Sequence, residues 1–161
     1  MRTFSLDHFF YFITFLGHWV VILLITLCLA FVLRKKMKGY LVWTLLLSVL
    51  GSGITTLLIK AFVDRARPAA DMALYAEKLS SFPSAHAALI FALFGFLIYS
   101  LWPLNFNTLT KYILAIISLS IILLIGFSRL YLGVHFLSDV IGGYLVGLLW
   151  VLIARYFARR R

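Results

Sequence analysis

Five long apolar runs divide this chain, and each is close to the roughly 20 residues that a helix needs to cross a bilayer. Apolar residues make up 64% of the 161 residues, whereas a soluble domain is usually about half apolar. We therefore predict an all-α integral membrane protein, a bundle of five transmembrane helices that forms one domain over residues 1–161. The expected spans are Gly17–Leu33, Tyr40–Phe62, Ser84–Leu101, Tyr112–Phe127 and Val134–Phe157.

The segment Phe4–Leu16 precedes the first span and is rich in aromatic residues, but it is too short to cross a bilayer alone. Ser5 can cap it as a helix, and Asp7 in its first turn would favour the helix dipole. We therefore expect an N-terminal interfacial helix or an outer extension of the first span. Cys28 lies in an apolar run and is the single cysteine, so a disulfide framework within the chain is ruled out.

Charge sets the expected orientation, because nine cations without any acid among them fall on one side of the predicted bundle. Short cytoplasmic loops are enriched in Lys and Arg. We therefore expect a multi-pass protein of the cell inner (plasma) membrane, with its C-terminus in the cytoplasm and its N-terminus outside. The net charge of +10 then reflects topology and anionic lipid headgroups, since a nucleic-acid partner would need a soluble basic face. The cations are Arg34, Lys35, Lys36, Lys38, Lys111, Arg155, Arg159, Arg160 and Arg161, and the acids opposite are Asp7, Asp64, Asp71, Glu77 and Asp139.

Three polar motifs lie where predicted spans meet the outer side of the membrane. The first two share one outer loop, and the third lies in the next outer loop, so the topology brings all three to one face. Ionisable residues at membrane depth are costly and indicate function by default. The motifs are Lys60 with Arg67-Pro68, then Pro83-Ser84-Ala85-His86, and then Ser128-Arg129 with His135 and Asp139.

Each motif residue also has an ordinary structural explanation when it is taken alone. Lys60 can snorkel from a helix end, and Ser84 after a proline is a common helix start. Arg65 and Arg67 can be loop charges, with Asp64 as a partner for either. A histidine such as His86 on an apolar helix is usually a core residue. The stronger pair is His135 and Asp139, whose i, i+4 spacing places both on one helix face within hydrogen-bonding reach.

Taken together and in order, the three motifs resemble the signatures of the type 2 phosphatidic acid phosphatase superfamily. These are membrane lipid phosphate phosphatases with a fold like that of the vanadium haloperoxidases. The resemblance covers about Lys60 to Gly143. Two features depart from the family pattern: Ala85 replaces the usual glycine of the second motif, and many members have six spanning helices.

The resemblance implies a role for each site residue. His135 would attack phosphorus and form a phosphohistidine, and Asp139 would orient its imidazole. His86 would protonate the leaving oxygen and then activate water. Positioning and charge neutralisation dominate phosphoryl transfer, and guanidinium groups match phosphate oxygens well, so we expect no metal or other cofactor. The residues expected to bind the substrate phosphate are Lys60, Arg67, Ser84 and Arg129.

The predicted function is metal-independent hydrolysis of a lipid phosphate or pyrophosphate at the outer membrane face. By resemblance, the substrate would be undecaprenyl pyrophosphate, phosphatidylglycerophosphate or phosphatidic acid, and the protein would be a monomer or weak homodimer in the bilayer. One alternative is a lipid phosphotransferase of the same fold. Another is a non-catalytic scaffold or transport subunit, against which the complete set of motif residues argues.

Two further patterns concern packing. Gly143 and Gly147 form a G-x-x-x-G pattern on the last span, which favours close packing within the molecule over dimerisation. The outer loop Ala69–Ser81 carries Met72, Leu74, Tyr75 and Leu79. We expect a short amphipathic helix there, which would cover the site or guide a lipid into it.

Overall fold

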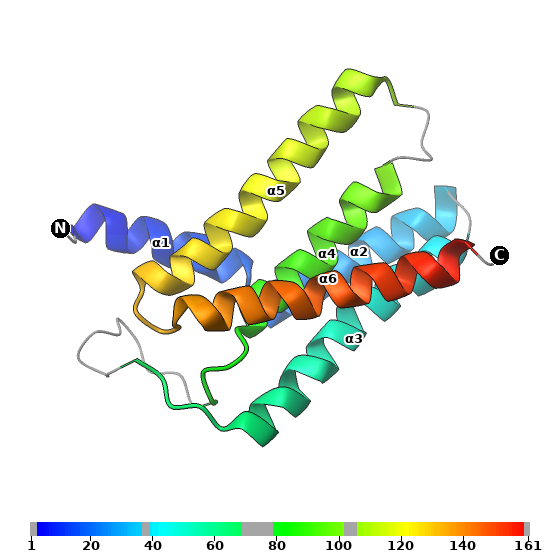
Figure 1. Cartoon of the computed structure of the whole chain (residues 1–161). Helices are drawn as coiled ribbons and strands as arrows, with labels where there is room; N and C mark the ends of the chain where they lie inside the picture. The colour runs from blue at the N-terminus through cyan, green and yellow to red at the C-terminus, as the bar shows by residue number, and fades with distance from the viewer. Residues whose placement is uncertain (1–2, 37–38, 69–78, 102–105, 160–161) are drawn as a thin grey trace.

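A computed structural model describes residues 3–36, 39–68, 79–101 and 106–159. The amphipathic helix expected within Ala69–Ser81 falls largely outside these residues. The described part is all-helical (Figure 1). Its helices are α1 (Phe4–Leu16), α2 (Trp19–Lys36), α3 (Tyr40–Val63), α4 (Ala85–Leu101), α5 (Thr108–Tyr131) and α6 (Leu137–Arg159).

Helices α2 to α6 occupy the positions of the five predicted spans, with ends that differ by up to four residues. Among the described helices, α3, α5 and α6 are each long and apolar enough to cross a membrane. The pair α1 and α2 passes the same test together but bends by 47° at the break between them. Helix α4 has 17 residues and therefore rises about 25 Å, less than the roughly 30 Å of a hydrocarbon core. The protein is thus an integral membrane helix bundle.

Helix α4 is the centre of this bundle and packs against α2, α3, α5 and α6 (Figure 1). Its closest neighbour is α6, where glycines let the two backbones meet. A Cβ atom on Gly143 would come within 2.5 Å of the Ser84 carbonyl oxygen, and one on Gly147 within 2.7 Å of the Ala88 carbonyl oxygen. The prediction that this G-x-x-x-G pattern packs within the molecule is confirmed.

The N-terminal segment is a helix that meets α2 at an elbow. Its cap is Thr3, whose hydroxyl oxygen accepts a hydrogen bond from the Leu6 amide, so the prediction of Ser5 as the cap was wrong by two residues. The elbow lies at Gly17 and His18, and α1 packs against α5. A Cβ atom on Gly17 would lie 2.7 Å from Cγ2 of Ile125, so glycine is needed for this close approach.

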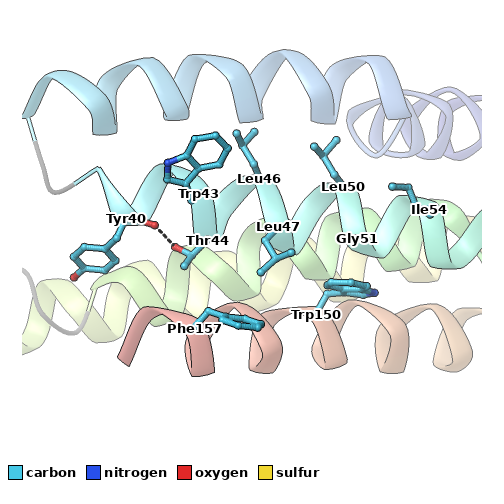
Figure 2. A pocket seen from close by; sticks show the side chains of 10 residues that line it. All are labelled: Tyr40, Trp43, Thr44, Leu46, Leu47, Leu50, Gly51, Ile54, Trp150 and Phe157. Carbon is cyan, nitrogen blue, oxygen red and sulfur yellow. Dashed lines mark hydrogen bonds between the residues drawn. The ribbon is translucent and has the colours of Figure 1, made fainter. Parts of the chain in front are cut away.

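An apolar groove of about 590 Å³ runs along α3 and α6 (Figure 2). It lies between the Tyr40 end of α3 and the Phe157 end of α6, and its lining includes Trp43 and Trp150. None of the motif residues lines it. Large apolar side chains are exposed on α1, α2, α3, α5 and α6, as a lipid-facing surface requires, so this groove belongs to that surface.

Candidate active site

The three polar motifs meet at one end of the bundle, where α3 and α5 end and α4 and α6 begin (Figure 1). A cavity of about 370 Å³ opens there. Motif residues and Leu79 form one side of the cavity, and residues of α1, α2 and the elbow form the other. The lining residues are Lys60, Arg67, Leu79, Ala85, His86 and His135 on the first side, and Tyr11, Thr14, Phe15, His18 and Trp19 on the second.

The third motif is placed by the tight junction between α5 and α6. Helix α5 ends at Tyr131, and Gly133 has a φ of 71°, a left-handed conformation that suits glycine. His135 therefore lies before α6, which begins at Leu137. The expectation that His135 and Asp139 share one helix face was wrong, although their side chains still meet.

Asp139 is fully buried and holds the start of α6 together. It stands three residues after Phe136 and its Oδ2 accepts a hydrogen bond from the Phe136 amide at 2.8 Å, which is the acidic half of a capping box. Nδ1 of His135 lies 3.4 Å from the same oxygen, a long contact compared with the usual 2.7–3.2 Å of a hydrogen bond. The carboxylate therefore lies close enough to orient His135 and to stabilise positive charge on its ring.

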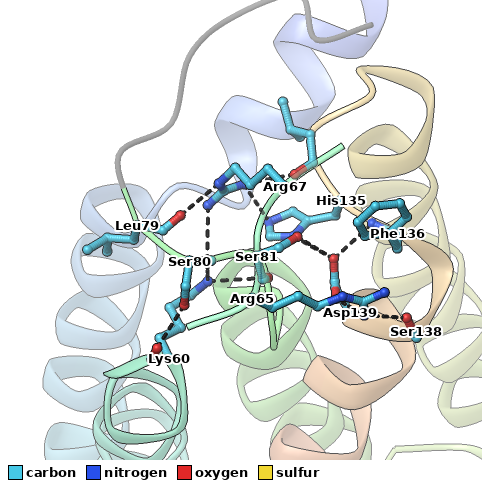
Figure 3. Close-up of polar contacts among 11 residues, drawn as sticks. Lys60, Arg65, Arg67, Leu79, Ser80, Ser81, His135, Phe136, Ser138 and Asp139 are labelled. Atoms are coloured by element: carbon cyan, nitrogen blue, oxygen red, sulfur yellow. Dashed lines mark hydrogen bonds and ion pairs between the residues drawn. The ribbon is translucent and has the colours of Figure 1, made fainter. Parts of the chain in front are cut away.

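Ser81 stands between these two residues (Figure 3). Its hydroxyl donates to Oδ2 of Asp139 and lies 3.4 Å from Nδ1 of His135. A hydroxyl that donates to the carboxylate can accept a hydrogen bond from the imidazole N–H. Ser81 therefore links Asp139 to His135. It belongs to none of the three motifs, and sequence analysis had no signal for it.

Arg65 forms the ion pair that balances Asp139. Its Nη1 lies 2.8 Å from Oδ1 of Asp139 and 2.7 Å from the Ser138 hydroxyl, and its guanidinium lies 4.5 Å from the Phe136 ring centre. Asp64 ends α3 with a φ of 39°. Among the described ion pairs, the partner of Arg65 is thus Asp139 on α6, and the interpretation of Arg65 as a loop charge was wrong.

Arg67 joins the first motif to the third. Its Nη1 donates to the Val134 carbonyl at 2.8 Å and lies 3.4 Å from Nε2 of His135, while its Nε donates to the Leu79 carbonyl at 2.8 Å. A guanidinium can only donate, so this contact favours the tautomer with a lone pair on Nε2 and the proton on Nδ1. His135 then presents Nε2 to the cavity beside a cation.

Lys60 is buried at the end of α3, where its Nζ donates to the carbonyls of Ser80 and Ser81. The Ser80 hydroxyl donates back to the Lys60 carbonyl at 2.8 Å. Lys60 therefore anchors the chain that carries Ser81, in addition to lining the cavity. The alternative interpretation of Lys60 as a side chain that snorkels to the surface was therefore wrong.

The remaining phosphate-binding candidates are fully buried. Arg129 donates from Nη1 to the Thr14 hydroxyl at 2.6 Å, which ties the end of α5 to α1. The Ser84 amide donates to the Asp139 carbonyl at 2.9 Å, which joins the start of α4 to α6. Among the described residues, the Ser84 hydroxyl has no hydrogen-bond partner, so it can donate to a bound anion.

His86 lies in the first turn of α4 and lines the same cavity. Its ring centre is 6.2 Å from that of His18, at an angle of 67°. Gly17 packs against it, since a Cβ atom there would lie 3.1 Å from Cδ2 of His86. The structure therefore brings all seven predicted site residues to one end of the bundle, and it adds Ser81, Arg65, Thr14 and His18.

The chemistry of this cavity suits an anion. Its polar lining combines Lys60, Arg67, His86 and His135, and the first turn of α4 presents backbone N–H groups that lack intrahelical acceptors. Within the described residues, no cluster of three or more His, Cys, Asp or Glu side chains could hold a metal ion. The donor set thus matches a phosphate group.

Comparisons with known proteins agree with this geometry. The PAP2 superfamily model matches residues 41–161. Phosphatidylglycerophosphatase B of Bacillus subtilis (strain 168) is 38% identical over 122 residues, which are 71% of this chain and 58% of that relative. The chain therefore spans less than two thirds of the length of this relative.

Two solved structures are similar over nearly the whole chain. A transmembrane PAP2 type phosphatidylglycerolphosphate phosphatase from Bacillus subtilis has a TM-score of 0.87 at 30% identity, covering 99% of this chain and 80% of its own. Aquifex aeolicus LpxE has a TM-score of 0.76 at 29% identity, covering 96% and 88%. The family match, these two folds and the convergence of the three motifs lead to one conclusion: this chain belongs to the PAP2 superfamily.

Proposed function

We propose that this protein is a metal-independent phosphatase that removes a phosphoryl group from a membrane lipid through a phosphohistidine. The observation that carries this proposal is the setting of His135, whose Nε2 lies 3.4 Å from the Arg67 guanidinium while its Nδ1 faces Ser81 and Asp139. One ring nitrogen is thus held for attack beside a cation, and the other is held by acceptors. The name of the Bacillus subtilis relative supports the same reaction class.

In the first step, the lone pair on Nε2 of His135 attacks phosphorus. An N–P bond forms, the bond from phosphorus to the lipid oxygen breaks, and that oxygen takes a proton from His86. Arg67, Lys60 and Arg129 offset the charge on the phosphoryl oxygens, and the Ser84 hydroxyl donates to one of them. The imidazolium of the intermediate is stabilised by Asp139, directly and through Ser81.

In the second step, water attacks the phosphohistidine. His86, now neutral, accepts a proton from that water, the N–P bond breaks, and inorganic phosphate leaves. His135 recovers its lone pair and His86 recovers its proton, so the cycle balances without a co-reactant. Imidazole suits both roles, because its charged form donates a proton and its neutral form accepts one.

An apolar cavity of about 470 Å³ beside the site supports a lipid substrate. It is lined by residues of α2, α3 and α4, and it shares Trp19, Leu79 and Ala85 with the catalytic cavity. Hydrocarbon chains can lie there while the phosphate lies against His135. Phosphatidylglycerophosphate, phosphatidic acid and undecaprenyl pyrophosphate all combine such chains with a terminal phosphate.

We place the site at the outer face of the plasma membrane. The described basic residues Arg34, Lys35, Lys111, Arg155 and Arg159 lie at the other ends of α2, α5 and α6. The positive-inside rule assigns that end to the cytoplasm. All seven site residues then face outward, together with the N-terminal helix.

Phosphate release by the purified full chain in detergent tests the proposal. We expect release from phosphatidylglycerophosphate, phosphatidic acid or undecaprenyl pyrophosphate to persist in excess EDTA, and an acid-labile phosphoenzyme to form. His135→Ala should abolish both, by a factor on the order of 10³ or more in rate, since the nucleophile is lost.

His8→Ala is the matched control, because His8 is exposed on α1 and its Nδ1 contacts only the Phe4 carbonyl of its own helix among the described polar contacts. A phosphoenzyme trapped in the His135→Ala variant would place the nucleophile elsewhere. Loss of activity in EDTA with recovery in Mg²⁺ would refute the metal-free mechanism. Transfer of phosphate to an added acceptor lipid, in place of release, would identify a phosphotransferase.

A further inference from the structure

The elbow between α1 and α2 supplies a wall of the catalytic cavity that lies outside all three motifs. Thr14, His18 and Trp19 line the cavity from this side. His18 carries a ring with two nitrogens into a site whose chemistry is otherwise assigned to α3–α6. From this position His18 can contact part of a substrate bound in the cavity.

The orientation of His18 is fixed by its neighbours. Its Nδ1 accepts a hydrogen bond from the Val20 amide at 3.4 Å, so His18 caps the start of α2. Its ring centre is 6.3 Å from that of Phe15, with the two planes only 14° apart, and 5.8 Å from that of Trp19. With Nδ1 as acceptor, the neutral ring carries its proton on Nε2, which makes Nε2–H a donor.

His18 lies on the side of the cavity where the leaving group must be. Its described ring contact within the motifs is with His86, at 6.2 Å, and His86 is the residue that protonates the leaving oxygen in the proposed mechanism. Arg67, which binds the transferred phosphoryl group in that mechanism, contacts His135 instead. Gly17 permits this close approach, because a Cβ atom there would lie 2.7 Å from Cγ2 of Ile125 and 3.1 Å from Cδ2 of His86.

We propose, resting on the phosphatase function above, that His18 is a specificity-determining residue that reads the leaving group. Its Nε2–H donates a hydrogen bond to an oxygen atom that the leaving group carries beyond the scissile P–O bond. The ligand chemistry is thus a polyoxygenated headgroup, such as a glycerol unit or a second phosphate. A leaving group of bare hydrocarbon gives His18 no acceptor.

The test compares two substrates that differ in this feature, using the purified full chain in detergent micelles. Phosphatidylglycerophosphate has a leaving group rich in oxygen atoms, whereas the leaving group of dodecyl phosphate is an alkanol with no other oxygen. His18→Ser keeps a side chain that caps α2 but cannot reach the cavity. His18→Gln places an amide donor near the position of Nε2, and His8→Ala is the matched control on α1.

We expect His18→Ser to lower kcat/KM for phosphatidylglycerophosphate by about 5- to 10-fold, because one hydrogen bond to the leaving group is lost. In contrast, kcat/KM for dodecyl phosphate should change by less than about 2-fold. His18→Gln should recover most of the loss. Equal losses on both substrates would make His18 a structural residue, and no loss on either would remove it from the site. Both results overturn this inference and leave the phosphatase intact, whereas a wild-type chain that releases no phosphate from any lipid refutes the function itself.

Discussion

The two walls of the catalytic cavity are held in different ways. On the wall built by α3, α5 and α6, Asp139 accepts hydrogen bonds from Arg65, Ser81 and the Phe136 amide. On the elbow wall, His18 is held by aromatic rings and one long hydrogen bond.

Hydrogen bonds to charged groups are short and directional. Aromatic pairs contribute roughly 0.5–1.5 kcal/mol of interaction free energy and allow several relative orientations of the two rings. The first wall thus fixes the atoms that exchange bonds in the proposed mechanism. The second wall can adapt to different lipids. Variants of residues on the two walls test this contrast, from the largest expected effect to the smallest.

Asp139→Asn changes the central residue of the wall built by α3, α5 and α6. The amide keeps the size of the carboxylate, but it loses the charge that stabilises the imidazolium and it disturbs the Nδ1–H tautomer of His135. We expect kcat to fall on the order of 10²–10⁴-fold, by analogy with the carboxylate of a catalytic triad. Single-turnover kinetics should show slower phosphoenzyme formation, and a normal rate would remove Asp139 from the mechanism.

Ser81→Ala tests the link between Asp139 and His135. Loss of the hydroxyl removes the donor to Oδ2 and the group 3.4 Å from Nδ1, so we expect kcat to fall about 10-fold with little change in KM. The comparison variant is Ser100→Ala, whose hydroxyl donates only to the Leu97 carbonyl at the far end of α4 among the described contacts. Equal rates in the two variants would show that Asp139 orients His135 without Ser81.

Thr14→Val tests the hydrogen bond that attaches α1, on the elbow side of the cavity, to the end of α5. Valine keeps the shape of threonine but cannot accept the hydrogen bond from Nη1 of Arg129. Arg129 has other contacts, so we expect a modest rise in KM for lipid phosphates, about 3-fold. Thr26→Val is the control, since that hydroxyl donates within its own helix to the Ile22 carbonyl. A fall in kcat instead of a rise in KM would mean that the elbow also helps to fix the reacting atoms.

Much of the fold could be predicted because hydrophobic runs in a membrane protein directly mark its helices. The positions of α2 to α6 follow from apolar length, and the meeting of the motifs follows from the alternation of loops between two sides. The seven motif residues could be predicted for the same reason. Each lies at a helix end whose side of the membrane is set by the order of the spans.

The residues that sequence analysis missed act across the fold. Ser81 meets Asp139 58 positions later in the chain, and Thr14 meets Arg129 115 positions later. No local spacing encodes such pairs, and serine or threonine near a helix end is common. Arg65 was visible as a charge, but its choice of Asp139 over Asp64 depends on how the chain folds back after α3. The same holds for His18, whose place in the cavity lining depends on the bend at Gly17.

The close contact between α4 and α6 has an evolutionary consequence. The residues that would exchange the phosphoryl group lie on or beside two helices whose backbones touch at Gly143 and Gly147. The family model begins at residue 41, so its match leaves out α1, α2 and the elbow. The family pattern therefore describes the helices that carry the three motifs and does not describe the elbow side of the cavity. The sequence constraints on the two halves of the cavity would then be unequal.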